Sequence, residues 1–190
     1  MKKGFTIIEV SILFVIFIIV AFLVAPLSLD DTMQAKNTSR WRTVQADFVN
    51  IFYSINTQEE AFELKDLLDN IIGNEVKSTV PTYKITFLNG TFPNKAFRFD
   101  EYLLTYSNAI IAYKLYDNSE SNVLGKLMYD VNGSTGPNTW GKDVFGFYIY
   151  KDRFEPFGKG KPLNEQKQDC SKTGTGLFCS NYYLIGGDFE

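Results

Sequence analysis

Residues 5–25 read FTIIEVSILFVIFIIVAFLVA, and this stretch decides the fold expected for the N-terminal part of the chain. Glu9 is the sole charged residue in it. At about 1.5 Å per residue, a helix of this length measures roughly 30 Å, the thickness of the hydrocarbon core of a bilayer. Lys2 and Lys3 precede the stretch, and flanking lysines hold such an end in the cytoplasm. We therefore predict a single-pass helix in the inner (cytoplasmic) membrane, with the rest of the chain on the extracytoplasmic side.

Two simpler interpretations of this N-terminus are a cleaved secretory signal and a plain signal anchor. A secretory signal has a short apolar core followed by a small-x-small cleavage site, whereas residues 23–26 read LVAP. Neither interpretation explains Glu9, because a carboxylate inside an apolar helix costs on the order of 2.5 kcal/mol or more and usually has a partner.

The composition of the whole chain excludes several classes of catalytic and metal site. Its 190 residues contain no histidine, which excludes Ser-His-Asp and Cys-His catalysis and histidine zinc sites. Two cysteines cannot supply the four thiolates of an all-cysteine zinc site or an iron–sulfur cluster. With 19 basic and 22 acidic residues the formal charge is −3, which argues against a nucleic-acid binder driven by net charge.

Residues 2–10, KKGFTIIEV, resemble the leader and first residues of type IV pilins and of type II secretion pseudopilins. The resemblance implies that a prepilin peptidase cleaves between Gly4 and Phe5 and methylates the new amino group of Phe5. It also implies that Glu9 pairs with the amino group of a neighbouring subunit during filament assembly. Pro26 matches a proline that bends the N-terminal helix in this family.

The function implied by the resemblance is that of a non-enzymatic structural subunit, a minor one, of a type IV pilus or a type II secretion filament. Its expected partners are the prepilin peptidase, other pilin subunits, the inner-membrane assembly machinery and, before assembly, membrane lipid. The assembled filament would be periplasmic or on the cell surface. Two alternatives stay open: a tip pilin that binds a ligand or DNA, and a membrane-anchored domain that never polymerises.

The remaining chain predicts a head of helices followed by strands. Apolar residues at helical spacing continue from Trp41 to Ile55, so the first helix either continues through Pro26 with a kink or is followed by a second one. A further helix is expected over 57–73 and a surface loop over 159–167. From residue 80 the period changes to two, which predicts short antiparallel strands; these are expected at 83–87, 95–99, 102–106, 110–116, 124–129 and 144–150.

The predicted fold class is therefore α+β, with a long N-terminal hydrophobic α-helix, a pilin-like stalk, packed into a head with an antiparallel β-sheet. The expected domains are listed in chain order: a leader at 1–4, a transmembrane or filament-core helix at 5–29, and a head at 30–190 that is helical over 30–73 and mainly β over 80–190.

Residues 130–143 hold the densest group of oxygen-bearing side chains. Asp130, Asn132 and Gly133 resemble the opening of a calcium loop, and Asp143 could close it. The glycine stands at loop position four rather than six, and Lys142 is adjacent to the closing carboxylate, so this is no EF-hand. Type II secretion major pseudopilins have a calcium-stabilised loop late in the head. A calcium site and a rigid turn built by Asx-turns both remain open interpretations.

Cys170 and Cys179 lie near the C-terminus, with two glycines between them. On the predicted topology both are in an oxidising compartment, where disulfides form. Many pilins close a C-terminal loop with one disulfide, and the resemblance implies a Cys170–Cys179 bridge here. Free thiols or a redox pair are the alternatives, although a redox pair usually has Cys-x-x-Cys spacing.

Overall fold

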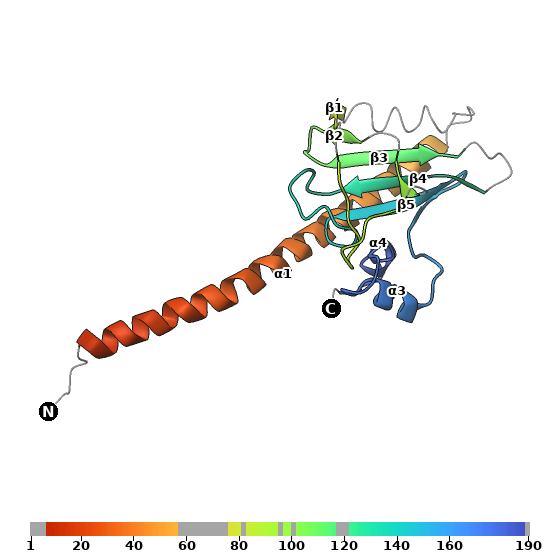
Figure 1. Cartoon of the computed structure of the whole chain (residues 1–190). Helices are drawn as coiled ribbons and strands as arrows, with labels where there is room; N and C mark the ends of the chain where they lie inside the picture. Colours follow the sequence, from red (N-terminus) through yellow and green to blue (C-terminus); the bar gives the residue numbers. More distant parts are fainter. Residues whose placement is uncertain are drawn as a thin grey trace. The chain divides into compact units, whose positions relative to one another are not determined.

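The structure is a computed structural model that forms two compact units, Met1–Lys36 and Asn37–Glu190 (Figure 1). It describes residues 7–56, 76–80, 83–94, 97–99, 102–116 and 122–188. The helix predicted over 57–73 lies outside the described residues, as do Gly4 and Phe5.

The helix α1 (Ile7–Asn56) runs from the first unit into the second and continues through Pro26 without a break. Isoleucine, leucine and phenylalanine dominate its beginning, and Glu9 in the first turn interacts favourably with the positive end of the helix dipole.

Among the residues that the structure describes, no helix is both long and apolar enough to cross a membrane. A span needs about 20 consecutive, predominantly apolar residues. The predicted single-pass inner-membrane location is therefore wrong. The same finding corrects the predicted fold class. The antiparallel sheet is present, but no described helix has the length and apolarity expected of the hydrophobic stalk.

The second unit contains one antiparallel sheet whose neighbouring strands follow one another along the chain. The strands are β1 (Val76–Thr79), β2 (Leu103–Thr105), β3 (Ile110–Leu115), β4 (Val123–Asp130), β5 (Val144–Tyr150) and β6 (Phe154–Pro156). The strands predicted over 102–106, 110–116, 124–129 and 144–150 are confirmed as β2 to β5. In such a meander each strand pairs with the next one along the chain, so no connection has to cross over the sheet.

Three predicted elements differ from the structure. In the strand predicted over 95–99, the described residues 97–99 form no strand. In the segment predicted as a strand over 83–87, Thr86 forms a single bridge to Thr139, because its backbone pairs with the loop between β4 and β5 instead of with a neighbouring strand. The loop predicted over 159–167 contains the start of α3 (Leu163–Asp169), which begins directly after Pro162. The Gln166 side chain donates to the Lys161 carbonyl at 2.8 Å and closes this start.

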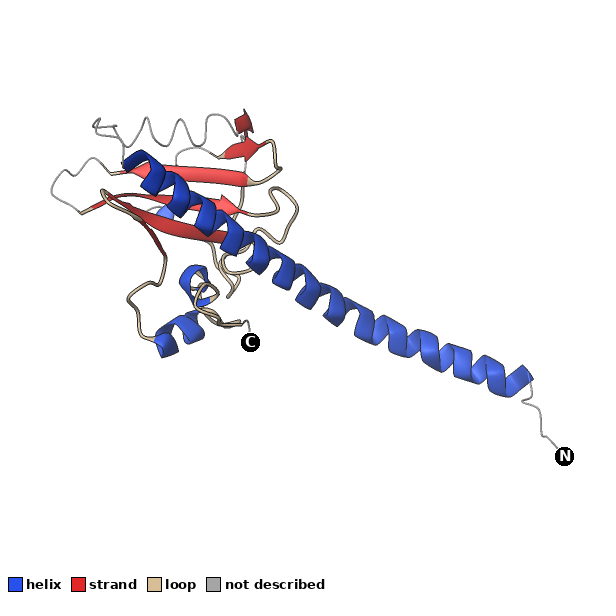
Figure 2. Cartoon of the chain, turned by 180° about the vertical axis from the view of Figure 1, so that it is seen from behind, coloured by secondary structure: helices blue, strands red, loops and turns tan. Residues whose placement is uncertain are grey.

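Both faces of the sheet are buried, and the side chains alternate between them. In β5, Phe145, Phe147 and Ile149 point to the face that also contains Trp41 of α1. Val144 belongs to the cluster on the opposite face, together with Ile85 and Phe99. Figure 2 shows the second half of α1 lying across its face of the sheet. Burial on both sides explains why the central strands read as nearly continuous apolar runs.

Trp41 connects α1 to the sheet and to the C-terminal segment. It is fully buried and its indole stacks on Phe145, with ring centroids 4.9 Å apart. Its Nε1–H donates to the Ser180 carbonyl at 2.8 Å, within α4 (Cys179–Tyr182). The Ser180 hydroxyl accepts in turn from the Gly146 amide of β5 at 3.0 Å. Three segments that are distant in sequence thus meet at one side chain.

Replacing Trp41 should therefore destabilise the second unit strongly. We expect Trp41→Ala to lower the free energy of unfolding by about 3–5 kcal/mol, because it removes a buried ring and leaves the Ser180 carbonyl without its donor. Trp41→Phe keeps part of the ring contact and should cost less. Urea denaturation followed by circular dichroism measures both. Thr43→Ala, at an exposed position on the same helix, is the control and should stay within about 0.5 kcal/mol of the unaltered chain. Equal midpoints for Trp41→Ala and Thr43→Ala would contradict this role.

Candidate functional site

The first half of α1 exposes nearly all of its large apolar side chains. Between Ile7 and Leu23 these side chains are 40% to 85% exposed, with Ile7 at the upper limit and Ile18 at the lower. They are distributed around the whole circumference of the helix rather than along one stripe. A helix that is apolar on every side is normally surrounded by other apolar groups. This half of α1 is therefore a candidate association surface.

Glu9 lies on the same stretch, in the first turn of α1, and is exposed. It is flanked by Ile8 and Val10, which are 72% and 53% exposed. If other apolar side chains cover this surface, the Glu9 carboxylate is carried with them into surroundings where an ion pair is stronger than in water. Pro26 lies within α1, and its predicted kink stays a prediction.

The three residues singled out for calcium, Asp130, Asn132 and Asp143, are brought together by one hairpin. Asp130 ends β4, and its pairing with Val144 places Asp143 at the opposite side of the same connection. Both carboxyl groups are fully buried. The helix α1 holds this hairpin from outside through Arg40, which donates to the Val131 carbonyl at 3.1 Å.

The oxygens of Asp130 and Asp143 accept hydrogen bonds from the chain around them. Asp130 Oδ1 accepts from the amides of Asn132 at 3.0 Å and Gly133 at 2.9 Å, which is an Asx-turn. Asp143 accepts from the amides of Asn138 at 2.8 Å and Thr139 at 2.7 Å. Each carboxyl group thus fixes one end of the loop between β4 and β5.

A tyrosine from a distant segment completes the cluster. The Tyr83 hydroxyl donates to Asp130 Oδ2. Burial raises the pKa of the Tyr83 hydroxyl, and the neighbouring Asp130 carboxyl raises it further. Sequence reasoning missed Tyr83, because 47 positions separate it from Asp130 and its segment resembled an ordinary strand.

Burial raises the pKa of Asp130 to about 8, and the nearby Asp143 carboxyl adds to the shift. Burial also raises the pKa of Asp143. Two carboxyl groups that share one desolvated loop oppose each other's ionisation, which favours a proton on the pair at neutral pH.

The geometry of the loop matches the interpretation of a rigid turn. Among the described residues, no group of three or more histidine, cysteine, aspartate or glutamate side chains could hold a metal ion. The Asp130 and Asp143 oxygens point at backbone amides and at Tyr83. The Asn132 side-chain oxygen has no hydrogen-bond partner within the described part of the chain. Calcium binding by Asp130, Asn132 and Asp143 stays a prediction, and the arrangement of these side chains does not support it.

The predicted disulfide between Cys170 and Cys179 is confirmed. Both sulfurs are buried in the cluster that contains Trp41. The bridge packs on the β4–β5 connection at Gly141, whose φ is +81° and where a Cβ would lie 2.6 Å from Cys179 Sγ. The loop is also closed by Asp169, whose carboxylate accepts from the amides of Thr175 and Phe178. The disulfide is therefore structural, within the second unit.

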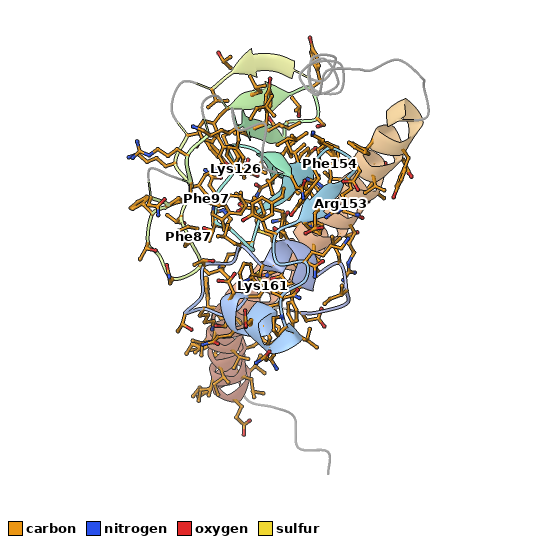
Figure 3. The ribbon with its side chains drawn as sticks, turned by 90° about the vertical axis from the view of Figure 1, so that its right-hand side faces the viewer. Phe87, Phe97, Lys126, Arg153, Phe154 and Lys161 are labelled. Atoms are coloured by element: carbon orange, nitrogen blue, oxygen red, sulfur yellow. A yellow bond between two sulfur atoms is a disulfide. The ribbon has the colours of Figure 1, made fainter. Side chains whose placement is uncertain are left out.

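Sequence reasoning also missed a buried cation. Lys126 in β4 is 1% exposed, and its ammonium lies 4.2 Å from the centroid of the Phe97 ring and 4.9 Å from that of Phe99. Figure 3 shows Lys126 and Phe97 together, apart from Arg153 and Phe154. The sequence of β4 does contain a signal for this buried cation. Lys126 and Met128 are two positions apart and therefore lie on the same face of the strand, where an apolar residue such as Met128 indicates burial. A cation on such a face needs aromatic or acidic surroundings.

In comparisons with known proteins, no family model, no curated protein and no solved structure matches the chain.

The buried carboxyl pair should make the stability of the second unit depend on pH. The unfolded Asp130 carboxyl ionises near its ordinary pKa of 3.8, whereas the folded one keeps its proton up to about 8. Between these values the folded chain binds the extra proton, so the free energy of unfolding falls as the pH rises, by up to about 1.4 kcal/mol per pH unit. Asp130→Asn cannot ionise and retains an oxygen for the Asn132 and Gly133 amides.

Urea denaturation of both chains between pH 5 and pH 9 measures this dependence. We expect a flatter profile for Asp130→Asn, with its largest stability advantage at the alkaline end. Asp152→Asn alters an exposed carboxylate and should leave the profile of the unaltered chain in place. A profile for Asp130→Asn as steep as that of the unaltered chain would contradict Asp130 as the source of the pH dependence.

Proposed function

We propose that the chain is a pilin-like structural subunit, processed by a prepilin peptidase between Gly4 and Phe5, that assembles into a filament through the first half of α1. The single observation that carries this proposal is the exposed, all-round apolar surface between Ile7 and Leu23. The sequence of residues 2–10 supports it by its resemblance to the pilin leader.

The size of this surface is the physical argument for association. Soluble monomers rarely expose contiguous apolar patches larger than a few hundred square ångströms, and larger ones mark sites of interaction. Burial of a large apolar side chain is worth about 1.5–3 kcal/mol. Fourteen such side chains are exposed between Ile7 and Leu23. A bundle of identical helices covers each of them on all sides, which one flat partner surface cannot do.

A filament also gives Glu9 a role that burial alone does not. A carboxylate placed among packed apolar helices is stabilised only when a cation meets it, and a bundle in the wrong axial stagger leaves it unpaired. Cleavage before Phe5 would create a cationic amino group near the start of the same helix. Glu9 and that amino group of a neighbouring copy can then select one stagger.

The first expected result concerns the N-terminus of the native protein. We expect mass spectrometry to find a chain that lacks Met1 to Gly4 and begins with N-methylated Phe5. Substituting Gly4→Val should block the cleavage, because a branched side chain replaces the residue that precedes the cut. An intact N-terminus in the assembled native protein would contradict processing.

A second expected result separates the carboxylate of Glu9 from the apolar surface. Glu9→Ala keeps that surface, so we expect normal cleavage but at least a tenfold loss from the filament fraction, since the stagger is no longer selected. Asp31→Ala removes another exposed carboxylate of α1 and is the matched control, with unchanged incorporation. The measurement is the ratio of sheared filament to total protein. Equal ratios for the two variants would remove Glu9 from assembly.

A further inference from the structure

A cavity of about 310 Å³ opens on the second unit between α1, β6 and α4. Its lining residues come from three segments: Gln45, Val49, Phe52 and Tyr53 of α1; Arg153, Phe154, Pro156 and Lys159; and Asn181 and Leu184. This volume is at the lower end of the range of small-molecule sites. No residue of the filament surface proposed above contributes to it.

The wall of the cavity is apolar and held by packing. Phe52 and Phe154 are each 5% exposed, and their rings meet edge to face with centroids 5.2 Å apart. Phe154 also contacts Phe48 in an edge arrangement at 5.6 Å. Tyr53 is 61% exposed, so its ring is accessible at the rim. The wall is therefore preformed and suits one aromatic or branched aliphatic group.

Two cations lie at the rim, but they differ in how far their charge is already balanced. The Arg153 guanidinium donates to Glu155 at 3.0 Å and to Asp152 at 2.9 Å, and it lies 4.2 Å from the centroid of the Tyr150 ring. Figure 3 shows Arg153 beside Phe154. Lys159 is exposed, and within the described part of the chain no carboxylate oxygen lies at ion-pair distance from its ammonium.

The amide of Asn181 gives the cavity a fixed polar group. Its Nδ2 donates to the Gln166 side-chain oxygen at 2.8 Å, which holds the side chain in one orientation. Its backbone amide donates to the Phe157 carbonyl at 3.1 Å. Asn181 can therefore present a polar group to a ligand without rearrangement.

We propose that this cavity is a binding site for a small carboxylic acid with an aromatic or branched aliphatic body. The body lies against Phe52, Phe154 and Leu184, and the carboxylate pairs with Lys159. Charge complementarity decides the class, because Lys159 is the rim cation whose charge is left for a ligand, whereas a neutral apolar molecule would leave it unused.

An NMR titration of the full chain with N-acetylphenylalanine tests this site. We expect saturable shifts of the backbone amides of Lys159, Asn181 and Leu184. The matched amide, N-acetylphenylalaninamide, has the same ring without the charge and should bind about three- to fivefold more weakly, as expected for one solvent-accessible ion pair.

Lys159→Gln removes the proposed partner at an exposed position, where the fold is not at risk. It should weaken binding of the acid about three- to fivefold and leave that of the amide unchanged. Lys172→Gln alters an exposed lysine outside the cavity and should change neither. The proposal is overturned by non-saturable shifts, by equal affinity for acid and amide, or by an acid affinity that Lys159→Gln leaves intact. None of these outcomes depends on filament assembly.

Discussion

The second unit depends on the contact between Trp41 and the centre of the sheet. The indole lies against Phe145 and Phe147, with ring centroids 4.9 Å and 4.6 Å away, and its one polar atom is bonded to the Ser180 carbonyl. A tryptophan can be fully buried without penalty only when its N–H finds such a partner. Because that partner belongs to α4, the C-terminal segment must be in place for the helix to dock. The cavity lined by Phe52 and Asn181 exists because these same two segments are held together.

Because the sheet is buried on both faces, some of its charged side chains lose their contact with water, which costs free energy. Lys126 and the pair Asp130 and Asp143 are almost inaccessible to water, and each needs compensation inside the fold. Lys126 has the faces of two phenylalanine rings. The two carboxyl groups have backbone amides and a raised pKa, so that a proton replaces the missing cation. The amides that donate to Asp130 and Asp143 fix both ends of the β4–β5 connection, on which the disulfide packs at Gly141.

The sequence could predict those parts of the fold whose signal is local. The strands β3 to β5 were predictable because each is a segment of six to eight residues, rich in apolar and aromatic side chains, that lies between turn residues. The strand β6 was not, because three residues that end in Pro156 contain too few positions to establish a period. The proximity of Asp130 and Asp143 follows from a hairpin and was foreseen. The contact of Tyr83 with that pair, and the cavity, arise from segments that only tertiary packing brings together, so no spacing in the sequence encodes them.

The membrane prediction is overturned because, among the described residues, no helix is long and apolar enough to cross a membrane. The apolar residues at the start of α1 still indicate association with other molecules, and this inference does not depend on a membrane. Among the described residues of the second unit, most large apolar side chains are buried, and the exposed ones, such as Phe92 and Tyr106, are scattered. In the first half of α1 almost none is buried. Folding of one chain therefore accounts for the apolar residues of the second unit but not for those between Ile7 and Leu23. Their burial requires other molecules, and in the proposed filament a bundle of like helices would provide it.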